Sequence, residues 1–249
     1  MYWFFHTFFY NPIYNALVFI VSTIPGGDVG LSIILLTVLV KLILFPLSLK
    51  AARTQLLMRE IDPLLREIKE KYKENKEEQA LKTLALYREK NVNPFAVILL
   101  TFIQIPIILG LYFVFFNEKL PIINTDILYS FIHAPEQVNL ILFGIFDVSK
   151  TSVILGVLAG VTQFLQVRLS MPKPAPLKEG VTPSFSDDFA RSMQMQMQYV
   201  LPVIITGVAL SVAAAISLYF VVSNLFAIGQ ELYIKREREA KGEATPTTA

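Results

Sequence analysis

A single lysine, Lys41, lies inside an otherwise uncharged apolar stretch, residues 30–49 (GLSIILLTVLVKLILFPLSL). About 20 residues at about 1.5 Å rise per residue cross the roughly 30 Å hydrocarbon core of a bilayer. A cation at that depth is costly unless water or a polar partner surrounds it, so it indicates a functional site. Lys41 precedes Lys50 by about 13 Å of helix, so the alternative, a structural lysine that reaches the membrane surface, requires a strained side chain or a thinned membrane.

Uncharged polar residues recur in this stretch and in the later apolar stretches. The candidates are Thr37, Gln104, Gln163, Ser217 and Asn224. Thr37 precedes Lys41 by four residues and therefore shares its helix face. Residues 30–49, 94–116, 151–168 and 192–230 contain no aspartate or glutamate, so they offer Lys41 no carboxylate counter-ion and no proton relay. Because a cation among hydroxyls and amides requires water, we predict a hydrated, positively charged groove in the inner half of the membrane.

Such a groove suits the movement of polypeptide segments into a membrane. Charged groups and backbone amides resist transfer into hydrocarbon. A hydrophilic groove through half of the membrane shortens the apolar barrier, and its positive charge attracts acidic segments. Partition of the apolar segment into lipid then drives insertion without ATP. The competing hypothesis is a small channel or transporter in which Lys41 selects anionic solutes.

The composition argues against an enzyme. Hydrophobic residues make up 54% of the chain and charged residues only 17%, below the roughly 25% of a soluble domain. The absence of cysteine excludes disulfides, thiolate metal sites and a cysteine nucleophile. The HExxH, Walker A, GxSxG and GxGxxG patterns are all missing. We therefore expect no catalytic residues, no metal, no cofactor and no nucleic-acid binding.

The predicted fold class is an all-α polytopic membrane protein. It is a bundle of five transmembrane helices, with an N-terminal interfacial helix and a cytoplasmic helical hairpin. The five spans are predicted at residues 30–49, 94–116, 151–168, 192–211 and 214–232, the last two because 192–230 has no charge and is about twice a crossing. The connecting segments are an external N-terminus with the interfacial helix (1–29), the charged hairpin (50–93), an external loop (117–150), a cytoplasmic loop (169–191) and a cytoplasmic tail (233–249).

The distribution of lysine and arginine predicts the orientation. The hairpin carries eleven, and residues 168–191 and the tail carry four each, whereas the opposite side carries only Lys119 and Lys150. Positive residues favour the cytoplasmic side. The N-terminus is therefore expected outside and the C-terminus inside, which agrees with an odd number of spans.

Four segments together resemble the YidC/Oxa/Alb3-like family of membrane protein insertases. They are GLSIILLTVLVKLILFPL (30–47), the end of the charged hairpin LALYREKNVNPF (84–95), FIQIPIILGLYF (102–113) and LYFVVSNLFAIGQ (218–230). They occur in the family's order and spacing, and the resemblance extends from about Tyr10 to Tyr233. It implies a five-helix membrane bundle, an insertase and chaperone activity, and a hairpin that receives substrate.

The resemblance also assigns roles by position. Lys41 takes the place of the family's groove arginine, and Thr37 that of its neighbouring threonine. The family's glutamine and proline of the second span fall on Gln104 and on Pro106, where a kink is expected. The residues expected to guide the inserting helix are Ile108 and the aromatic pair Tyr219 and Phe220. Ser223 and Asn224 match the family's final Ser-Asn pair.

The resemblance implies nascent membrane proteins as clients, the lipid bilayer as their destination, and a bacterial cytoplasmic membrane location. The Sec translocon and the ribosome are candidate further partners. This chain departs from the family in three ways. Lysine replaces arginine at position 41, and LSVAAAIS (210–217) replaces the usual Pro- and Gly-containing reversal. Finally, no large external domain or lipid-anchored cysteine is recognisable, so we expect a minimal bacterial member.

Overall fold

The structure is a computed structural model that describes residues 2–93, 95–118, 120–170, 192–193 and 195–241. These residues form two compact units. The bundle unit comprises the residues up to 42 and residues 105–231, and the hairpin unit comprises residues 43–104 and those from 232 on. The predicted loop at 169–191 lies outside the described residues from 171 on, and the predicted tail at 233–249 does so from 242 on.

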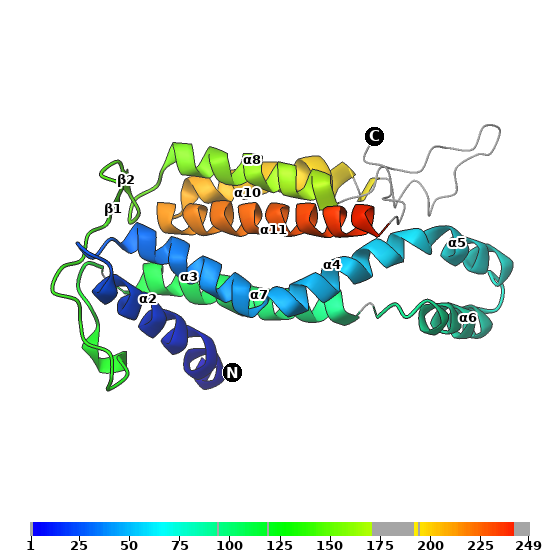
Figure 1. Cartoon of the computed structure of the whole chain (residues 1–249), viewed down its shortest axis with the longest axis horizontal. Helices are drawn as coiled ribbons and strands as arrows, with labels where there is room; N and C mark the ends of the chain where they lie inside the picture. Colours follow the sequence, from blue (N-terminus) through cyan, green and yellow to red (C-terminus); the bar gives the residue numbers. More distant parts are fainter. Residues whose placement is uncertain (1, 94, 119, 171–191, 194, 242–249) are drawn as a thin grey trace. The chain divides into compact units, whose positions relative to one another are not determined.

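The bundle unit is built from long apolar helices (Figure 1). An N-terminal helical segment runs through α1 (Tyr2–Phe5), the π-helical turn η1 (His6–Tyr10) and α2 (Asn11–Thr23). The other helices are α3 (Val29–Ile43), α7 (Phe95–Asn117) from Ile105 on, α8 (Val153–Ser170), the π-helical turn η3 (Gln196–Val200), α10 (Leu201–Ser211) and α11 (Ala214–Ala240) as far as Glu231. The reversal predicted near residues 211–215 therefore lies between α10 and α11.

The hairpin unit contains three charged helices, α4 (Phe45–Glu60), α5 (Asp62–Lys71) and α6 (Lys76–Glu89). A small apolar cluster of Ile61, Leu65, Leu86 and Val92 joins α5 to α6. The Asn75 side chain caps α6 by accepting from the Glu78 N–H at 3.1 Å, which satisfies one of the free donors at a helix start. The sequence predicts this turn within 72–79, and α5 and α6 are joined there.

The first predicted span is divided in the structure. Helix α3 ends at Ile43 and α4 begins at Phe45, whereas the sequence predicted one helix over 30–49. Proline lacks an N–H, and its ring clashes with the carbonyl four residues earlier. Pro46 therefore cannot continue α3, but it is tolerated at the second residue of a new helix. The helix boundary is a local effect that the sequence analysis overlooked.

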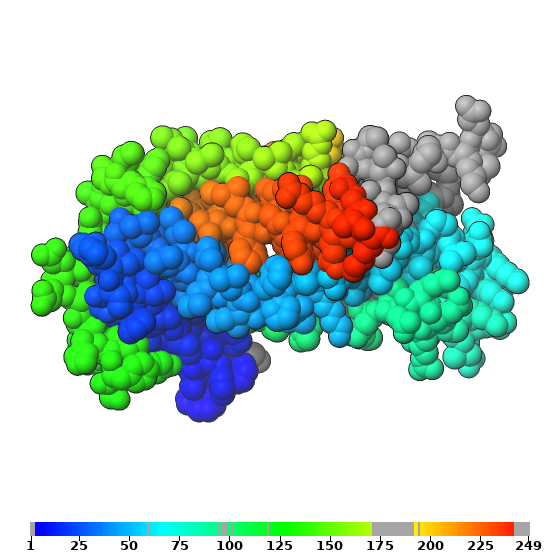
Figure 2. All heavy atoms as spheres, in the orientation of Figure 1, coloured from blue at the N-terminus to red at the C-terminus, as the bar shows by residue number. Residues whose placement is uncertain are grey.

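The core of the bundle unit brings together α2, α3, α7, α11 and the loop 117–150. In Figure 2, α11 lies between α8 and α3. The largest fully buried side chains of this core include Tyr14 and Leu17 of α2 and Ile33 of α3. The N-terminal helix is thus a packed element of this unit, and its exposed face carries Trp3, Phe4, Phe8 and Phe19.

The loop 117–150 is held against α2 by hydrogen bonds. Asn15, 1% exposed, donates to the Ile127 carbonyl and accepts from the Tyr129 N–H at 2.8 and 2.7 Å. The loop contains a short 3₁₀ turn, η2 (Thr125–Ile127), and a pair of antiparallel strands, β1 (Ile141–Leu142) and β2 (Phe146–Asp147). The fold is mostly helical as predicted, but this small β-hairpin corrects the all-α expectation.

The same loop completes the reversal between α10 and α11. The Ala214 N–H donates to the Lys150 carbonyl at 2.7 Å and the Ala215 N–H to the Val148 carbonyl at 2.9 Å. Both alanines are fully buried. Because the loop carbonyls satisfy the first donors of α11, the reversal needs no proline or glycine, and small side chains admit the loop backbone.

Asp147 orders the turn that presents those carbonyls. Its carboxylate accepts from the Ser149 hydroxyl at 2.6 Å and the Ser149 N–H at 3.0 Å. Lys150 forms an ion pair with it at 3.0 Å. The Ser149 hydroxyl and the Lys150 ammonium hold the pKa of the Asp147 carboxyl below its usual range.

Helices α8 and α10 pack closely through two glycines in the pattern GxxxG. A Cβ at Gly160 would lie 1.8 Å from the Thr206 hydroxyl oxygen, and one at Gly156 would lie 2.8 Å from the Leu210 side chain. Small residues at this spacing let membrane helices approach closely, because dispersion contacts between backbones replace contacts with lipid. Glycine is therefore required at Gly160 by the neighbouring helix.

Among the described residues, three helices are long and apolar enough to cross a membrane. They are Trp3–Thr23, Val153–Ser170 and Ala214–Ala240, and a fourth results if Val29–Ile43 and Phe45–Met58 form one broken span. Phe102–Asn117 and Gln196–Ser211 are apolar but shorter. The N-terminal helix thus has the length of a span, whereas the sequence analysis predicted an interfacial helix there.

Candidate functional site

Lys41 lies in the last turn of α3, two residues before the helix ends at Ile43, and it is half-buried. The carbonyls of the last turn of a helix lack intrahelical partners and carry partial negative charge. A lysine ammonium near them is stabilised by about 0.3–1 kcal/mol. Lys41 is therefore at a helix end and not, as the sequence analysis assumed, within a continuous helix running to Lys50.

Thr37 lies one turn earlier on the buried side of α3, and it is 2% exposed. Its hydroxyl donates to the Ile33 carbonyl at 2.7 Å. Bonds of this kind satisfy a polar side chain inside its own helix. The oxygen of Thr37 retains acceptor capacity, so it is suited to receive a hydrogen bond from a cation or a water.

Two of the predicted polar site residues make hydrogen bonds between helices. Asn224 of α11 donates to the Thr162 hydroxyl of α8 at 3.2 Å and to the Ala159 carbonyl at 3.4 Å. Ser217, fully buried, donates to the Ala209 carbonyl of α10 at 2.9 Å. Side chains of this type hold membrane helices together. These contacts give Asn224 and Ser217 a packing role beside α8 and α10.

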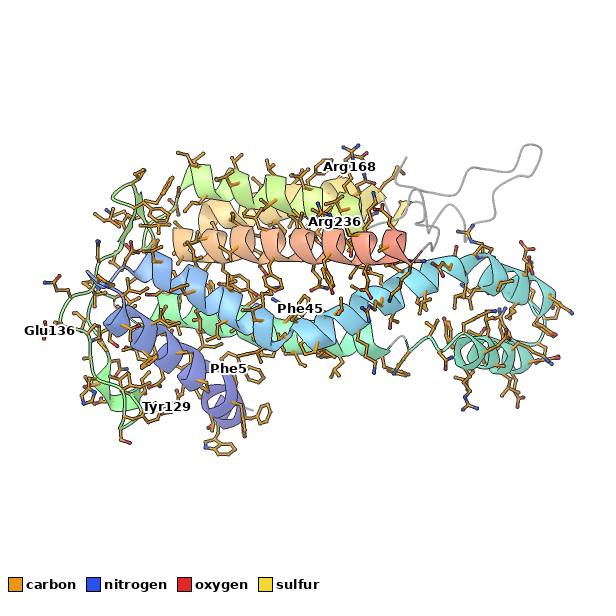
Figure 3. The ribbon with its side chains drawn as sticks, viewed as in Figure 1. Phe5, Phe45, Tyr129, Glu136, Arg168 and Arg236 are labelled. Carbon is orange, nitrogen blue, oxygen red and sulfur yellow. The ribbon has the colours of Figure 1, made fainter. Side chains whose placement is uncertain are left out.

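Gln163 lies next to Thr162 in α8. It donates to the Gln166 side chain at 3.3 Å, and Gln166 donates to the Ser170 hydroxyl at 3.1 Å. This chain of amides runs along α8 toward its end, where Figure 3 labels Arg168. The structure thus places Gln163 in a polar row on α8, with Asn224 bound to the adjacent Thr162.

The aromatic pair on α11 divides between the core and its edge. Tyr219 is 2% exposed, whereas Phe220 is partly buried and packs against the same core. The two ring centroids lie 5.8 Å apart in an edge-to-face arrangement. Ile108 of α7 is also partly buried against this core. Phe220 and Ile108 therefore keep some apolar surface available, and Tyr219 is packed inside.

Pro106 lies within α7, which continues through it from Phe95 to Asn117. Proline has no N–H to donate, so the Phe102 carbonyl lacks its usual intrahelical partner. The predicted kink at Pro106 stays a prediction. Gln104, on the same helix, belongs to the hairpin unit and is half-buried.

At the N-terminal end of the bundle unit, the Tyr10 hydroxyl donates to the Glu118 carboxylate. Phe5 lies against Phe113 of α7, with ring centroids 5.9 Å apart (Figure 3). This aromatic contact between α7 and the N-terminal helix was not predicted from the sequence. The phenylalanine-rich segment 3–9 was its signal.

The hairpin unit contains a cleft of about 750 Å³ that the sequence analysis also missed. Its charged lining residues are Lys69, Lys76 and Arg88, and no acidic residue lines it. Apolar lining comes from Ala80, Leu84, Tyr87, Val92 and Phe95. The available signal was the helical spacing of Leu84 and Tyr87. Among the described residues, no three His, Cys, Asp or Glu side chains gather as metal ligands would.

Comparisons with known proteins point to one family. A family model described as "60Kd inner membrane protein" matches residues 20–241. The chain is 34% identical over 216 residues to proteins named "Membrane protein insertase YidC" from Francisella tularensis subsp. novicida (strain U112) and subsp. holarctica (strain LVS). Each alignment covers 86% of this chain and 34% of the relative. The chain therefore spans about a third of the length of the curated relatives it matches.

Proposed function

We propose that this chain, which belongs to the 60Kd inner membrane protein family, is a membrane protein insertase. Its clients are apolar segments of nascent membrane proteins, and its place of action is the bacterial cytoplasmic membrane. The observation that carries the proposal is the match over residues 20–241, together with relatives named as insertases. That match includes Lys41 and the apolar helices that precede and follow residues 50–93 in the sequence.

Lys41 supplies the positive charge of a hydrophilic groove open to cytoplasm and lipid. Its position supports this role, because the helix end beside it offers carbonyls that water or a client also contacts. Thr37, one turn away, supplies an acceptor. Gln104 and Gln163 provide further polar groups, whereas the interhelical bonds of Ser217 and Asn224 maintain the walls. An acidic client segment is attracted to the charge and shielded from hydrocarbon.

The apolar segment of the client then leaves the groove along partly buried side chains. Phe220 and Ile108 are suited to this contact because they pack at the edge of the core. Tyr219 orients Phe220 from inside the core. Transfer of apolar surface into lipid drives the step, so neither nucleotide hydrolysis nor a catalytic residue is needed.

Reconstitution tests the function and the charge together. Purified chain in liposomes is given a single-span client with an acidic N-terminal tail, and protease protection of the tail reports insertion. We expect insertion without ATP, retention of insertion in Lys41→Arg, and a loss on the order of tenfold in Lys41→Ala, which removes the half-buried charge. Wild-type insertion with undiminished Lys41→Ala insertion would reject the charge role. No insertion, with chloride flux through the same liposomes, would replace the insertase by an anion pathway.

The proposed topology has five crossings, with the N-terminus outside and the C-terminus in the cytoplasm. The crossings are residues 30–49 (α3 and the start of α4), then α7, α8, α10 preceded by η3, and α11, and the rest of α4 from Lys50 on belongs to the cytoplasmic hairpin (50–93). The hairpin α5–α6 is cytoplasmic, the loop 117–150 is external, and the N-terminal helix lies at the outer membrane surface. The Sec translocon and the ribosome are proposed further partners on this layout. The helix Trp3–Thr23 is long enough to cross the membrane. Whether it lies at the surface or crosses is therefore the sharpest test of this topology.

Labelling of single introduced cysteines determines the position of the N-terminal helix, because the chain has no cysteine of its own. Trp3→Cys, Asp126→Cys and Glu74→Cys are labelled from outside with a membrane-impermeant maleimide. We expect labelling at positions 3 and 126 and protection at 74. Protection at position 3 with labelling at 126 would show that Trp3–Thr23 crosses the membrane, and the N-terminus would then be cytoplasmic.

A further inference from the structure

The cleft of the hairpin unit has a pattern that the proposed groove does not use. Its lining follows one face of α6, at Lys76, Ala80, Leu84, Tyr87 and Arg88. These positions recur every three or four residues and therefore form a stripe along the helix. From Lys76 to Arg88 the stripe is about 18 Å long. It is thus an elongated surface, longer than a phosphate or a headgroup.

Cations lie at the two ends of this stripe, and apolar side chains lie between them. Lys69 and Lys76 lie at one end, where the Gln79 side chain donates to the Lys69 carbonyl at 2.9 Å and ties α5 to α6. Arg88 lies at the other end. Between the two ends lie Ala80, Leu84 and Tyr87, and Leu84 is 47% exposed.

The cations of the stripe remain available for a ligand. None of the ion pairs among the described residues of the hairpin unit involves Lys69, Lys76 or Arg88. Two acidic side chains of the hairpin unit pair outside the cleft, Asp62 with Arg66 and Glu89 with Lys90. Figure 2 shows the exposed surface of α5 and α6. A cleft with three cations and no carboxylate in its lining fits an anionic partner.

We propose that this cleft binds an amphipathic helical segment of the client, with acidic residues at both ends and an apolar face between them. An apolar helix face laid into a groove is a common recognition mode. Three to four helical turns match the length of the stripe. The acidic ends pair with Lys69 and Lys76 at one side and with Arg88 at the other, and the apolar face contacts Leu84 and Tyr87. This inference rests on the proposed function, since it identifies the client segment that is held before insertion.

The test is peptide binding to the full chain in nanodiscs of zwitterionic lipid. The probe is a fluorescent peptide of about four helical turns, with a leucine face and glutamates at both ends. A second probe carries lysines in place of the glutamates. We expect saturable binding of the glutamate peptide, weakened by added salt, and far weaker binding of the lysine peptide.

Matched variants locate the binding. Lys69→Glu/Lys76→Glu/Arg88→Glu reverses the cleft charges, and Lys71→Glu/Lys73→Glu/Lys82→Glu makes the same change of net charge outside the cleft lining. We expect the first variant to weaken the glutamate peptide on the order of tenfold, and the second to change it by less than about threefold. Equal effects of the two triple variants would overturn the proposal, because binding would then follow net charge alone.

A leucine pair tests the apolar contact. Leu84→Ser removes an apolar side chain from the cleft, and Leu81→Ser changes a similarly exposed leucine of α6 outside its lining. We expect weaker peptide binding only for Leu84→Ser. If instead the cleft variant loses binding to vesicles of anionic phosphatidylglycerol and keeps binding to the peptide, the cleft is a lipid site and the proposal is wrong.

Client insertion by the same preparations separates this inference from the proposed function. Insertion by the wild type with peptide binding that ignores the cleft residues would reject the cleft alone. Cleft-dependent peptide binding without any insertion would reject the insertase and retain a binding site for acidic amphipathic helices.

Discussion

In the bundle unit, buried polar side chains bond to neighbouring helices. Asn224 reaches Thr162 across 62 positions of sequence, and Ser217 reaches Ala209 within the reversal. In the hairpin unit, charged side chains lie at the surface, and a cluster of four buried apolar residues holds α5 to α6. A polar group in hydrocarbon needs an internal partner, whereas water solvates one at the surface. Polar side chains of the bundle unit therefore join its helices, whereas those of the hairpin unit lie at a surface held together by apolar contacts.

Exposed ion pairs contribute less to the hairpin unit than its apolar cluster does. Arg53 of α4 and Glu237 of α11 form a pair at 2.7 Å, and Arg238 pairs with Glu60. Such exposed pairs contribute about 0–1 kcal/mol each and are screened by salt. They join α4 to the charged end of α11, but the apolar cluster is the stronger support of this unit. Substitutions in either unit test this difference between them.

The largest effect is expected where α8 and α10 touch. Gly160→Val places a branched side chain where a Cβ already lies 1.8 Å from Thr206, and overpacking of this kind costs about 3 kcal/mol. Gly207→Val is the matched control, because nothing lies within 4 Å of its Cβ. Thermal unfolding in detergent measures both variants. Equal melting temperatures would show that the α8–α10 contact does not determine bundle stability.

A smaller and more local effect is expected in the hairpin unit. Leu65→Ala removes a side chain that is 7% exposed, and Leu64→Ala removes its neighbour, which is 39% exposed. We expect Leu65→Ala to destabilise α5 and α6 by about 2 kcal/mol, with little change for Leu64→Ala. Amide hydrogen exchange should show faster exchange in residues 62–89 and unchanged protection in α8 and α11. Faster exchange throughout the chain would mean that the two units unfold as one.

The smallest effect is expected at the bond between α11 and α8. Asn224→Ala loses a donor to the Thr162 hydroxyl, and such bonds between membrane helices contribute roughly 1 kcal/mol. A double-mutant cycle with Thr162→Val isolates the pair. We expect a coupling free energy of unfolding of that size and near-normal insertion by the single variants. Lost insertion with no coupling would place Asn224 in the groove and not in helix packing.

The sequence by itself determined the apolar helices, the charged hairpin segment and the isolation of Lys41, because each depends on composition and spacing within one stretch of chain. It also contained the end of α3, since the effect of Pro46 is local. The β-hairpin of residues 141–147 could not be predicted from the sequence, because strands of two residues show no detectable periodicity.

Only the tertiary structure decided which polar residues serve assembly. Asn224 and Gln104 look alike in sequence, as amides in apolar helices, but Asn224 meets Thr162 through contacts between distant segments. The reversal at 212–213 likewise depends on carbonyls of Val148 and Lys150, which come from another part of the chain. The cleft of the hairpin unit arises only when α5 and α6 pack together. Long-range contacts select partners that local spacing does not specify, so these features were settled by the packing.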